Sequence, residues 1–218
     1  MDTEYNNPIK IDGNESSFES GATRYTKDGK GCFDLIPSDI LSEILQREKF
    51  YEPKTAIEIF TAGFNAIAFD NPEYLIDIIL NLSMVYYTMN YNASINKTTT
   101  VDDNMLLTNY ITNDVTNTST VPIIDVAVPY TLLDLAKHYE NGAKLYGVDN
   151  WKKGIPCYSF FDSGMRHLCQ FLIGKDDENH CISAIWNFIG YIWTYRNKPT
   201  LRMDKCGRPD FKEFTDKE

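Results

Sequence analysis

Apolar side chains recur at helical spacing along most of the chain, and this feature constrains the fold more than any other. Near the C-terminus, Ile182, Ile185, Ile189 and Ile192 fall on one face of a helix. Strand-like alternation is weakly indicated at one place only, over 121–128. The spacing therefore predicts an all-α protein, with helices over 35–50, 53–69, 72–91, 130–146, 158–173 and 180–195.

The segments outside these helices differ from them in composition. Residues 1–31 are rich in Asn, Ser, Gly and charge, which predicts an irregular arm, and 197–218 form a charged tail. Residues 92–120 are dense in Asn, Thr, Asp and Ser, which is typical of a polar linker. The helix over 72–91 has an apolar run shorter than the ~20 residues that span a bilayer, so we expect it to be buried in protein rather than in a membrane.

The net charge of −10 is unevenly distributed and limits the classes of ligand. Residues 1–131 carry 8 basic and 19 acidic side chains, whereas residues 132–218 carry 13 and 12. An acidic chain without clustered Lys and Arg does not favour binding to duplex nucleic acid. The balanced second part is still compatible with a ligand that carries phosphate groups.

Cysteine usage and the N-terminus indicate a reducing compartment. Cys157, Cys169 and Cys181 recur inside apolar stretches, and the total of five cysteines is odd, so we expect buried free thiols. The first ten residues are polar and lack the apolar core of a secretory signal. Both observations predict a cytoplasmic protein.

A set of polar residues gathers at the predicted helix ends in the second part of the chain. Oxygen and imidazole groups on facing helices are how helical bundles hold divalent metals, and neighbouring Lys, Arg and Asn suit phosphate groups. Each member also has a purely structural interpretation. Asp162 and Arg166 are spaced as a helix ion pair, Glu178 precedes a helix where carboxylates are favourable, and Trp151 is equally suited to packing. The set is Lys144, Asn150, Lys152, Lys153, Glu140, Asp162, Arg166, Glu178, His180 and Trp151.

Four sequence blocks give a more specific indication. They are SGATRYTKDGKGCFDLIPSDIL at 20–41, ENGAKLYGVDNWKKGIP at 140–156, DSGMRHLCQFLIG at 162–174 and ENHCISAIWNF at 178–188. In this order they resemble the phage-type dATP/dGTP diphosphohydrolase family, which is grouped with the MazG-like all-α nucleoside triphosphate pyrophosphatases. The resemblance implies a helical bundle, a Mg²⁺ or Mn²⁺ cofactor, a homo-oligomer, and a role in remodelling phage nucleotide pools.

The resemblance also implies an organisation and a set of functional residues. The catalytic helical domain would be split into 32–46 and 126–196, with 47–125 as an acidic helical insertion. Glu140, Asp162 and Arg166 would be catalytic, and Glu140, Asp162, Glu178 and His180 would bind the metal. The substrate would contact Lys30, Asp34, Lys144, Asn150, Trp151, Lys152, Lys153 and Asn187.

Three positions depart from the family pattern. Cys32 stands where Arg is usual, Lys175 where an acid is usual, and Ser183 where a second histidine is usual. The surviving acids favour an enzyme that hydrolyses purine (deoxy)nucleoside triphosphates to monophosphate and pyrophosphate, with metal ions bridging the phosphate oxygens. The departures keep a second hypothesis open, a catalytically weak module that binds a nucleotide or a host protein.

A faint internal similarity links two of the predicted helices. The sequence IFTAGFNAIAFDN at 59–71 parallels HYENGAKLYGVDN at 138–150, with Thr61 in place of Glu140. Chance similarity between two amphipathic helices is the alternative explanation. A true repeat would be a structural copy without the acidic residue.

Overall fold

The structure, a computed structural model, describes residues 15–17, 23–25, 29–47, 52, 54–95 and 124–202. The linker expected over 92–120 therefore lies mostly outside the described residues, as do most of the charged tail and Cys206. The helices are α1 (Ser38–Arg47), α2 (Ala56–Ala68), α3 (Tyr74–Ile95), α5 (Ile124–Tyr146), α6 (Cys157–Leu172) and α7 (His180–Asn197). Short 3-10 helices are η1 (Phe33–Leu35), η4 (Asn150–Lys153) and η5 (Pro199–Leu201).

The protein is all-α, as the apolar spacing predicts. A short antiparallel pair of strands, β1 (Glu15–Ser17) and β2 (Thr23–Tyr25), lies within the arm that was expected to be irregular. The weak strand indication over 121–128 is wrong from residue 124 onward, because α5 begins there and continues through Pro129. Ala127 and Val128 are buried, so burial of this turn outweighs the unfavourable effect of a nearby proline.

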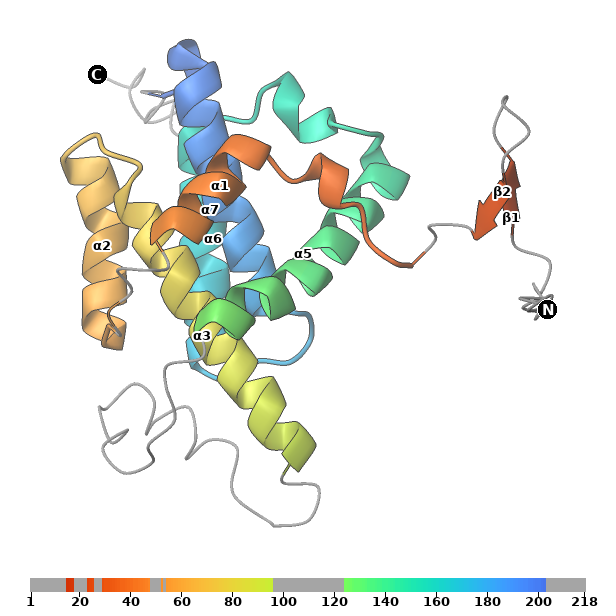
Figure 1. Cartoon of the computed structure of the whole chain (residues 1–218). Coiled ribbons are helices and arrows are strands. Elements are labelled where there is room, and N and C mark those ends of the chain that lie inside the picture. Colours follow the sequence, from red (N-terminus) through yellow and green to blue (C-terminus); the bar gives the residue numbers. More distant parts are fainter. Residues whose placement is uncertain are drawn as a thin grey trace, which may run out of the picture.

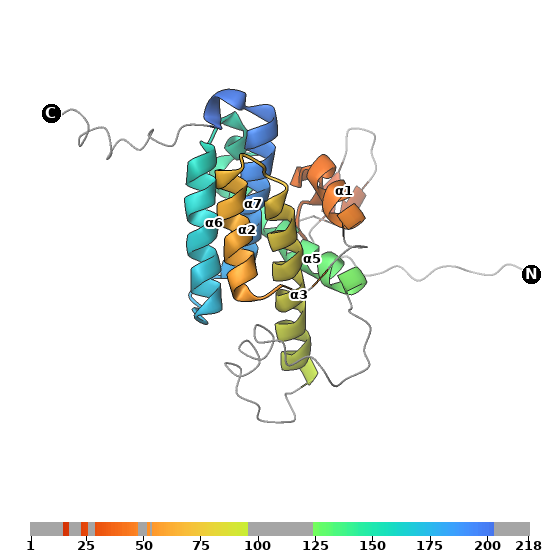
Figure 2. The same ribbon diagram turned by 90° about the vertical axis from the view of Figure 1, so that its left-hand side faces the viewer.

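Helix α7 runs through the middle of the bundle, with α6 packed alongside it (Figures 1 and 2). The four isoleucines at helical spacing are each at most 1% exposed, as expected for a core face. Other faces of α7 are buried as well, because α3 and α5 also pack against it. This central position fixes the first turn of α7, where the candidate site lies.

Helix α3 is also part of the core. Leu75, Ile76 and Ile78 are fully buried, and α3 packs against α2, α5 and α7. The prediction that this apolar helix is buried in protein is therefore confirmed. Among the described residues, no helix is long and apolar enough to cross a membrane.

Reciprocal contacts between glycine and phenylalanine bring α6 and α7 close together. A Cβ atom built on Gly164 of α6 would lie 2.7 Å from Cε1 of Phe188 on α7. A Cβ atom on Gly190 of α7 would lie 2.4 Å from Cε1 of Phe160 on α6. Each glycine thus accommodates an aromatic ring of the other helix, and both rings are buried.

We expect Gly190→Ala to lower the free energy of unfolding by about 1–3 kcal/mol, since overpacking against Phe160 outweighs the better helix propensity of alanine. Urea denaturation measures the change. Gly142→Ala on α5 is the matched control, because a Cβ atom there meets nothing within 4 Å. That variant should gain stability, and equal effects of the two substitutions would contradict the steric argument.

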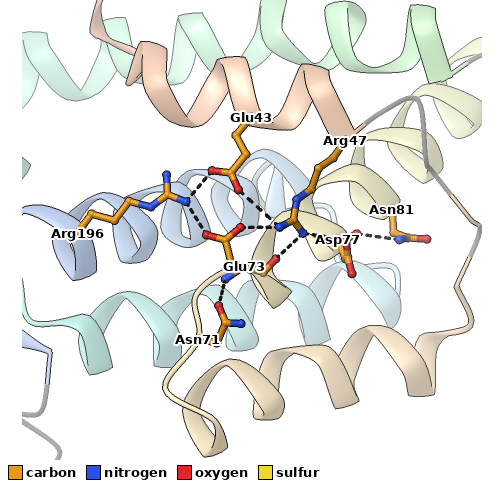
Figure 3. A network of polar contacts seen from close by, with 7 residues as sticks. All are labelled: Glu43, Arg47, Asn71, Glu73, Asp77, Asn81 and Arg196. Atoms are coloured by element: carbon orange, nitrogen blue, oxygen red, sulfur yellow. Dashed lines mark hydrogen bonds and ion pairs between the residues drawn. The ribbon is translucent and has the colours of Figure 1, made fainter.

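An ion-pair network joins α1, α7 and the start of α3 (Figure 3). Nη2 of Arg196 lies 2.6 Å from Oε2 of Glu43 and 2.7 Å from Oε1 of Glu73. Nη2 of Arg47 lies 2.5 Å from Oε2 of Glu73 and 3.6 Å from Oε1 of Glu43. Such partly exposed pairs contribute little stability individually, so their main effect is to orient the three segments.

The described cysteines are free thiols. Cys157 and Cys181 are buried, as expected, whereas Cys169 is exposed. The burial expected for Cys169 is therefore wrong, because this residue lies on the solvent side of α6 despite its apolar sequence neighbours.

Candidate metal centre and adjoining pocket

The chain has three histidines, and two of them meet directly. His167 on α6 and His180 at the start of α7 place their Nδ1 atoms 3.1 Å apart. Oε1 of Glu178, in the loop between these helices, lies 3.1 Å from Nδ1 of His167 and 3.3 Å from Nδ1 of His180. We call these three residues the histidine–glutamate cluster.

The donor atoms of this cluster suit a metal ion. Ligands with bonds of about 2.1 Å are separated by about 3.0 Å along an octahedral edge and about 3.4 Å along a tetrahedral edge. The observed separations of 3.1, 3.1 and 3.3 Å fall in this interval. Two imidazole nitrogens and one carboxylate make a donor set that favours Mn²⁺ over Mg²⁺, since Mg²⁺ prefers oxygen ligands.

The surroundings of the cluster support a ligating role for both histidines. Nε2 of His180 lies 2.8 Å from Oδ1 of Asp177, and donation from this nitrogen leaves Nδ1 unprotonated toward the cluster. Burial lowers the pKa of His167, although the nearby Glu178 carboxylate opposes this effect. The side chain of His180 is 1% exposed, whereas that of Glu178 is 49% exposed, so the cluster is closed on one side and open on the other.

The loop that carries Glu178 is tied to the rest of the bundle by a chain of hydrogen bonds. Asn179 accepts from the backbone N–H of Ile182 at 3.2 Å and so caps α7. Its Nδ2 donates to the hydroxyl of Tyr86 at 2.8 Å, and this hydroxyl donates to Oδ2 of Asp134 at 2.7 Å. Helices α3 and α5 therefore both hold the loop in position.

A pocket of about 580 Å³ adjoins the cluster and shares Glu178 with it. Its walls come mainly from the C-terminal half of α5, from η4 and from Trp186 of α7. This volume is typical of small-molecule sites. The lining residues are Leu35, His138, Tyr139, Asn141, Gly142, Ala143, Leu145, Tyr146, Gly147, Asp149, Asn150, Trp151, Ile155, Glu178 and Trp186.

Aromatic rings and a few polar groups give the pocket its chemistry. The ring centroid of Trp151 lies 6.1 Å from that of Tyr139 and 6.4 Å from that of Trp186. The ring of His138, the third histidine, lies 5.6 Å from Trp186, and burial lowers its pKa. Such an aromatic wall suits a flat ligand.

Charged residues lie on η4 and just before it, and of these Asp149 lines the pocket. Nζ of Lys152 lies 2.8 Å from Oδ1 of Asp149 and 5.4 Å from the ring centroid of Trp151. Nζ of Lys153 donates to Oδ1 of Asn150 at 3.1 Å. The expected substrate residues Asn150, Trp151, Lys152 and Lys153 are thus brought together, and two of them line the pocket.

Glu140 lies apart from the histidine–glutamate cluster. It is buried, accepts hydrogen bonds from the backbone N–H groups of Gly29 and Gly31 at 2.7 Å each, and pairs with Nζ of Lys144 at 2.8 Å. Its position two residues after His138 turns it by about 200° around α5. The metal set expected from sequence is therefore not gathered around one point, and Glu140 anchors the arm instead.

We expect the anchoring of the arm by Glu140 to weaken in acid. The Lys144 ammonium and the two backbone donors lower the pKa of Glu140 from 4.5 to about 2. A lowered folded-state pKa gives stabilisation that is present above pH 4.5 and lost as the pH falls toward 2. Urea denaturation at several pH values should show a steeper loss in the wild type than in Glu140→Gln. Parallel pH profiles of the two proteins would contradict this.

Asp162 and Arg166 also lie outside the cluster. Oδ2 of Asp162 is 3.5 Å from Nη1 of Arg166, both side chains are exposed, and the pair matches the helix ion pair that the spacing allows. Asp162 precedes His167 by five residues, so on helix α6 it lies about 140° around the axis from His167, away from the side that faces α7.

Three other residues expected at the substrate site lie elsewhere. Lys30 and Asp34 are exposed. Asn187 is buried, and its Nδ2 donates to the carbonyl of Ser183.

Several candidate residues were not singled out from the sequence. They share a position at the cluster or in the pocket, and they are His138, Tyr139, Asp149, His167, Asp177 and Trp186. The sequence contains one signal for His167. The chain has only three histidines, and His167 and His180 both lie in the family-like blocks, which favours a shared role for these two.

Residues 113–204 match the family model described as dATP/dGTP diphosphohydrolase, N-terminal. The matched segment contains the cluster, the pocket walls from α5, η4 and α7, and three of the four sequence blocks. The opening block at 20–41 lies outside it. No curated protein and no solved structure matches the chain. Through this segment, which is less than half of its length, the chain is similar to the dATP/dGTP diphosphohydrolase N-terminal family.

Proposed function

We propose that the protein hydrolyses purine (deoxy)nucleoside triphosphates to monophosphate and pyrophosphate in a metal-dependent reaction. The observation that carries this proposal is that the histidine–glutamate cluster opens, through Glu178, onto an aromatic pocket of about 580 Å³. A ligand with a flat base and a phosphate chain could occupy both parts at once. The family match over this segment supports the same activity.

Different residues of the cluster and the pocket would bind the metal, the base and the phosphates. His167, Glu178 and His180 would hold Mn²⁺ or Mg²⁺, which when bound supplies Lewis-acid stabilisation of phosphate oxygens. Trp151 and Trp186 would contact the base. We assign Arg166, which directly precedes His167, and Lys152 and Lys153, which directly follow the pocket residue Trp151, to the phosphates.

Two further elements belong to the proposal. Glu140 would act by holding residues 29–31 against α5 and orienting Lys144, not as a metal ligand. A homo-oligomer fits the exposed apolar residues beside the pocket, since Leu145, Tyr146 and Val148 are 75%, 70% and 66% exposed. A second copy would shield this surface from water.

Incubation with Mn²⁺ and each of the dNTPs and NTPs tests the activity. Chromatography should show a monophosphate and pyrophosphate from purine substrates, and EDTA should abolish their formation. Nucleotide binding without turnover of any substrate would refute the proposal. That outcome would favour the non-catalytic module suggested by Cys32, Lys175 and Ser183.

A further inference from the structure

The hydroxyl group of Tyr139 is an unsatisfied polar group at the pocket. Tyr139 is 3% exposed and lines the pocket, and its hydroxyl has no hydrogen-bond partner among the residues that the structure describes. Burial raises the pKa of this phenol, so it is a neutral donor at physiological pH. A buried hydroxyl without a partner costs free energy, which a ligand atom at hydrogen-bond distance would recover.

The carboxylate of Asp149 is the second polar group of this part of the pocket. Asp149 lines the same pocket as Tyr139, and its charge adds to the effect of burial in raising the pKa of that phenol. Lys152 contacts Oδ1 of Asp149 at 2.8 Å and balances its charge. A carboxylate accepts about four hydrogen bonds, so Asp149 retains capacity for a ligand. The backbone of Asp149, directly before η4, is left-handed, with φ of 55°.

We propose that Tyr139 and Asp149 read the base edge of the substrate and select guanine over adenine. Guanine presents adjacent N–H donors at positions 1 and 2 and an acceptor at O6. Asp149 would accept from both donors, and the Tyr139 hydroxyl would donate to O6. The inference rests on the proposed function only in taking the ligand to be a purine nucleotide.

Adenine and hypoxanthine match these two groups less well. Adenine offers one exocyclic amino group and an acceptor at N1, so Asp149 loses one donor. Hypoxanthine keeps N1–H and O6 but lacks the 2-amino group. A site that hydrogen-bonds a ligand group discriminates against analogues without it, because its own polar atom is then left unpaired. The aromatic wall of Trp151 and Trp186 would contact all purines and does not discriminate.

Calorimetric titration of the full chain with Mn²⁺ tests the inference, using α,β-methylene analogues of dGTP, dITP and dATP. The wild type should bind the dGTP analogue at least about tenfold more tightly than the other two, as expected for a hydrogen bond to a charged acceptor. Asp149→Asn should reduce this ratio to below about threefold, and Tyr139→Phe should weaken dGTP binding about two- to tenfold.

The variants are chosen to preserve the fold. Asparagine adopts left-handed backbone readily, so Asp149→Asn keeps the turn before η4, and circular dichroism checks that the helices remain. Asp39→Asn, the same change at an exposed position on α1, is the control and should leave the selectivity unchanged.

Equal affinity of the wild type for the dGTP and dITP analogues would overturn the inference. Undiminished selectivity in Asp149→Asn would overturn it as well. These outcomes are separable from the proposed activity. Selective binding of the dGTP analogue without hydrolysis of dGTP would refute the proposed activity alone. Hydrolysis of both dGTP and dATP, with equal affinities for their analogues, would refute the proposed selection of guanine alone.

Discussion

His167→Gln is expected to weaken Mn²⁺ binding by more than ~100-fold and to lower nucleotide turnover by ~1,000-fold or more. The reason is that one of three ligand atoms is removed, whereas loss of an outer-sphere partner alone already costs ~10–100-fold. Glu178→Gln should have a similar effect, since its carboxylate lies 3.1 Å and 3.3 Å from the two Nδ1 atoms. Titration of Mn²⁺, followed by the electron paramagnetic resonance of the free ion, measures the affinity without requiring activity.

The outer-sphere partner provides a graded test of the same site. Asp177→Asn should weaken Mn²⁺ binding about 10–100-fold, because Nε2 of His180 loses its charged acceptor. Asp176→Asn, the same change at the exposed neighbouring residue, is the matched control and should bind Mn²⁺ like the wild type. Wild-type affinity in His167→Gln would refute the assignment of the metal to the histidine–glutamate cluster.

Trp151→Ala is expected to lower the free energy of unfolding by about 3–5 kcal/mol, the usual cost of truncating a buried tryptophan. The ring is 8% exposed and meets the rings of Phe160 and Trp193 at centroid distances of 6.5 and 5.1 Å, besides those of the pocket wall. Urea denaturation measures the change, and Trp151→Phe should lose less because it keeps part of the aromatic contact.

An exposed apolar residue outside the pocket lining is the control for this prediction. Ile57 on α2 is 78% exposed, so Ile57→Ala should change the free energy of unfolding by less than about 0.5 kcal/mol. A small effect of Trp151→Ala would mean that Trp151 serves the ligand and contributes little to packing. The sequence left both roles open, and the contacts with α6 and α7 support packing in addition to the pocket.

Local sequence was sufficient to predict most of the helices. The helices α2, α6 and α7 begin and end within about three residues of the expected bounds, because strong apolar periodicity and capping residues mark them. Thr55 illustrates this, since it forms a capping box with Glu58 at the start of α2. Helix α5 begins six residues before the expected start, because Pro129 suggests a boundary, whereas the buried residues Ala127 and Val128 keep the helix intact before it.

The internal similarity between 59–71 and 138–150 has a local structural counterpart. Asp70 and Asp149 occupy equivalent positions, and they are the non-glycine residues with positive φ in the part of the chain that the structure describes. Both follow the end of a helix, α2 and α5 respectively. Similar local sequences thus produce similar chain reversals, whereas the α2 end lacks a counterpart of Glu140.

The sequence by itself determined the helical class, the buried faces of α3 and α7, and the family resemblance of the second part. Only the tertiary structure decided which side chains meet. Periodicity assigns a residue to a face of its own helix but does not state which face of another helix it will contact. The close packing of α6 against α7 brings His167 to His180. The position of Glu140 around the axis of α5 directs its side chain away from these histidines and toward Gly29 and Gly31. The structure therefore groups two of the four metal ligands expected from sequence, Glu178 and His180, with His167, and it places Glu140 and Asp162 elsewhere.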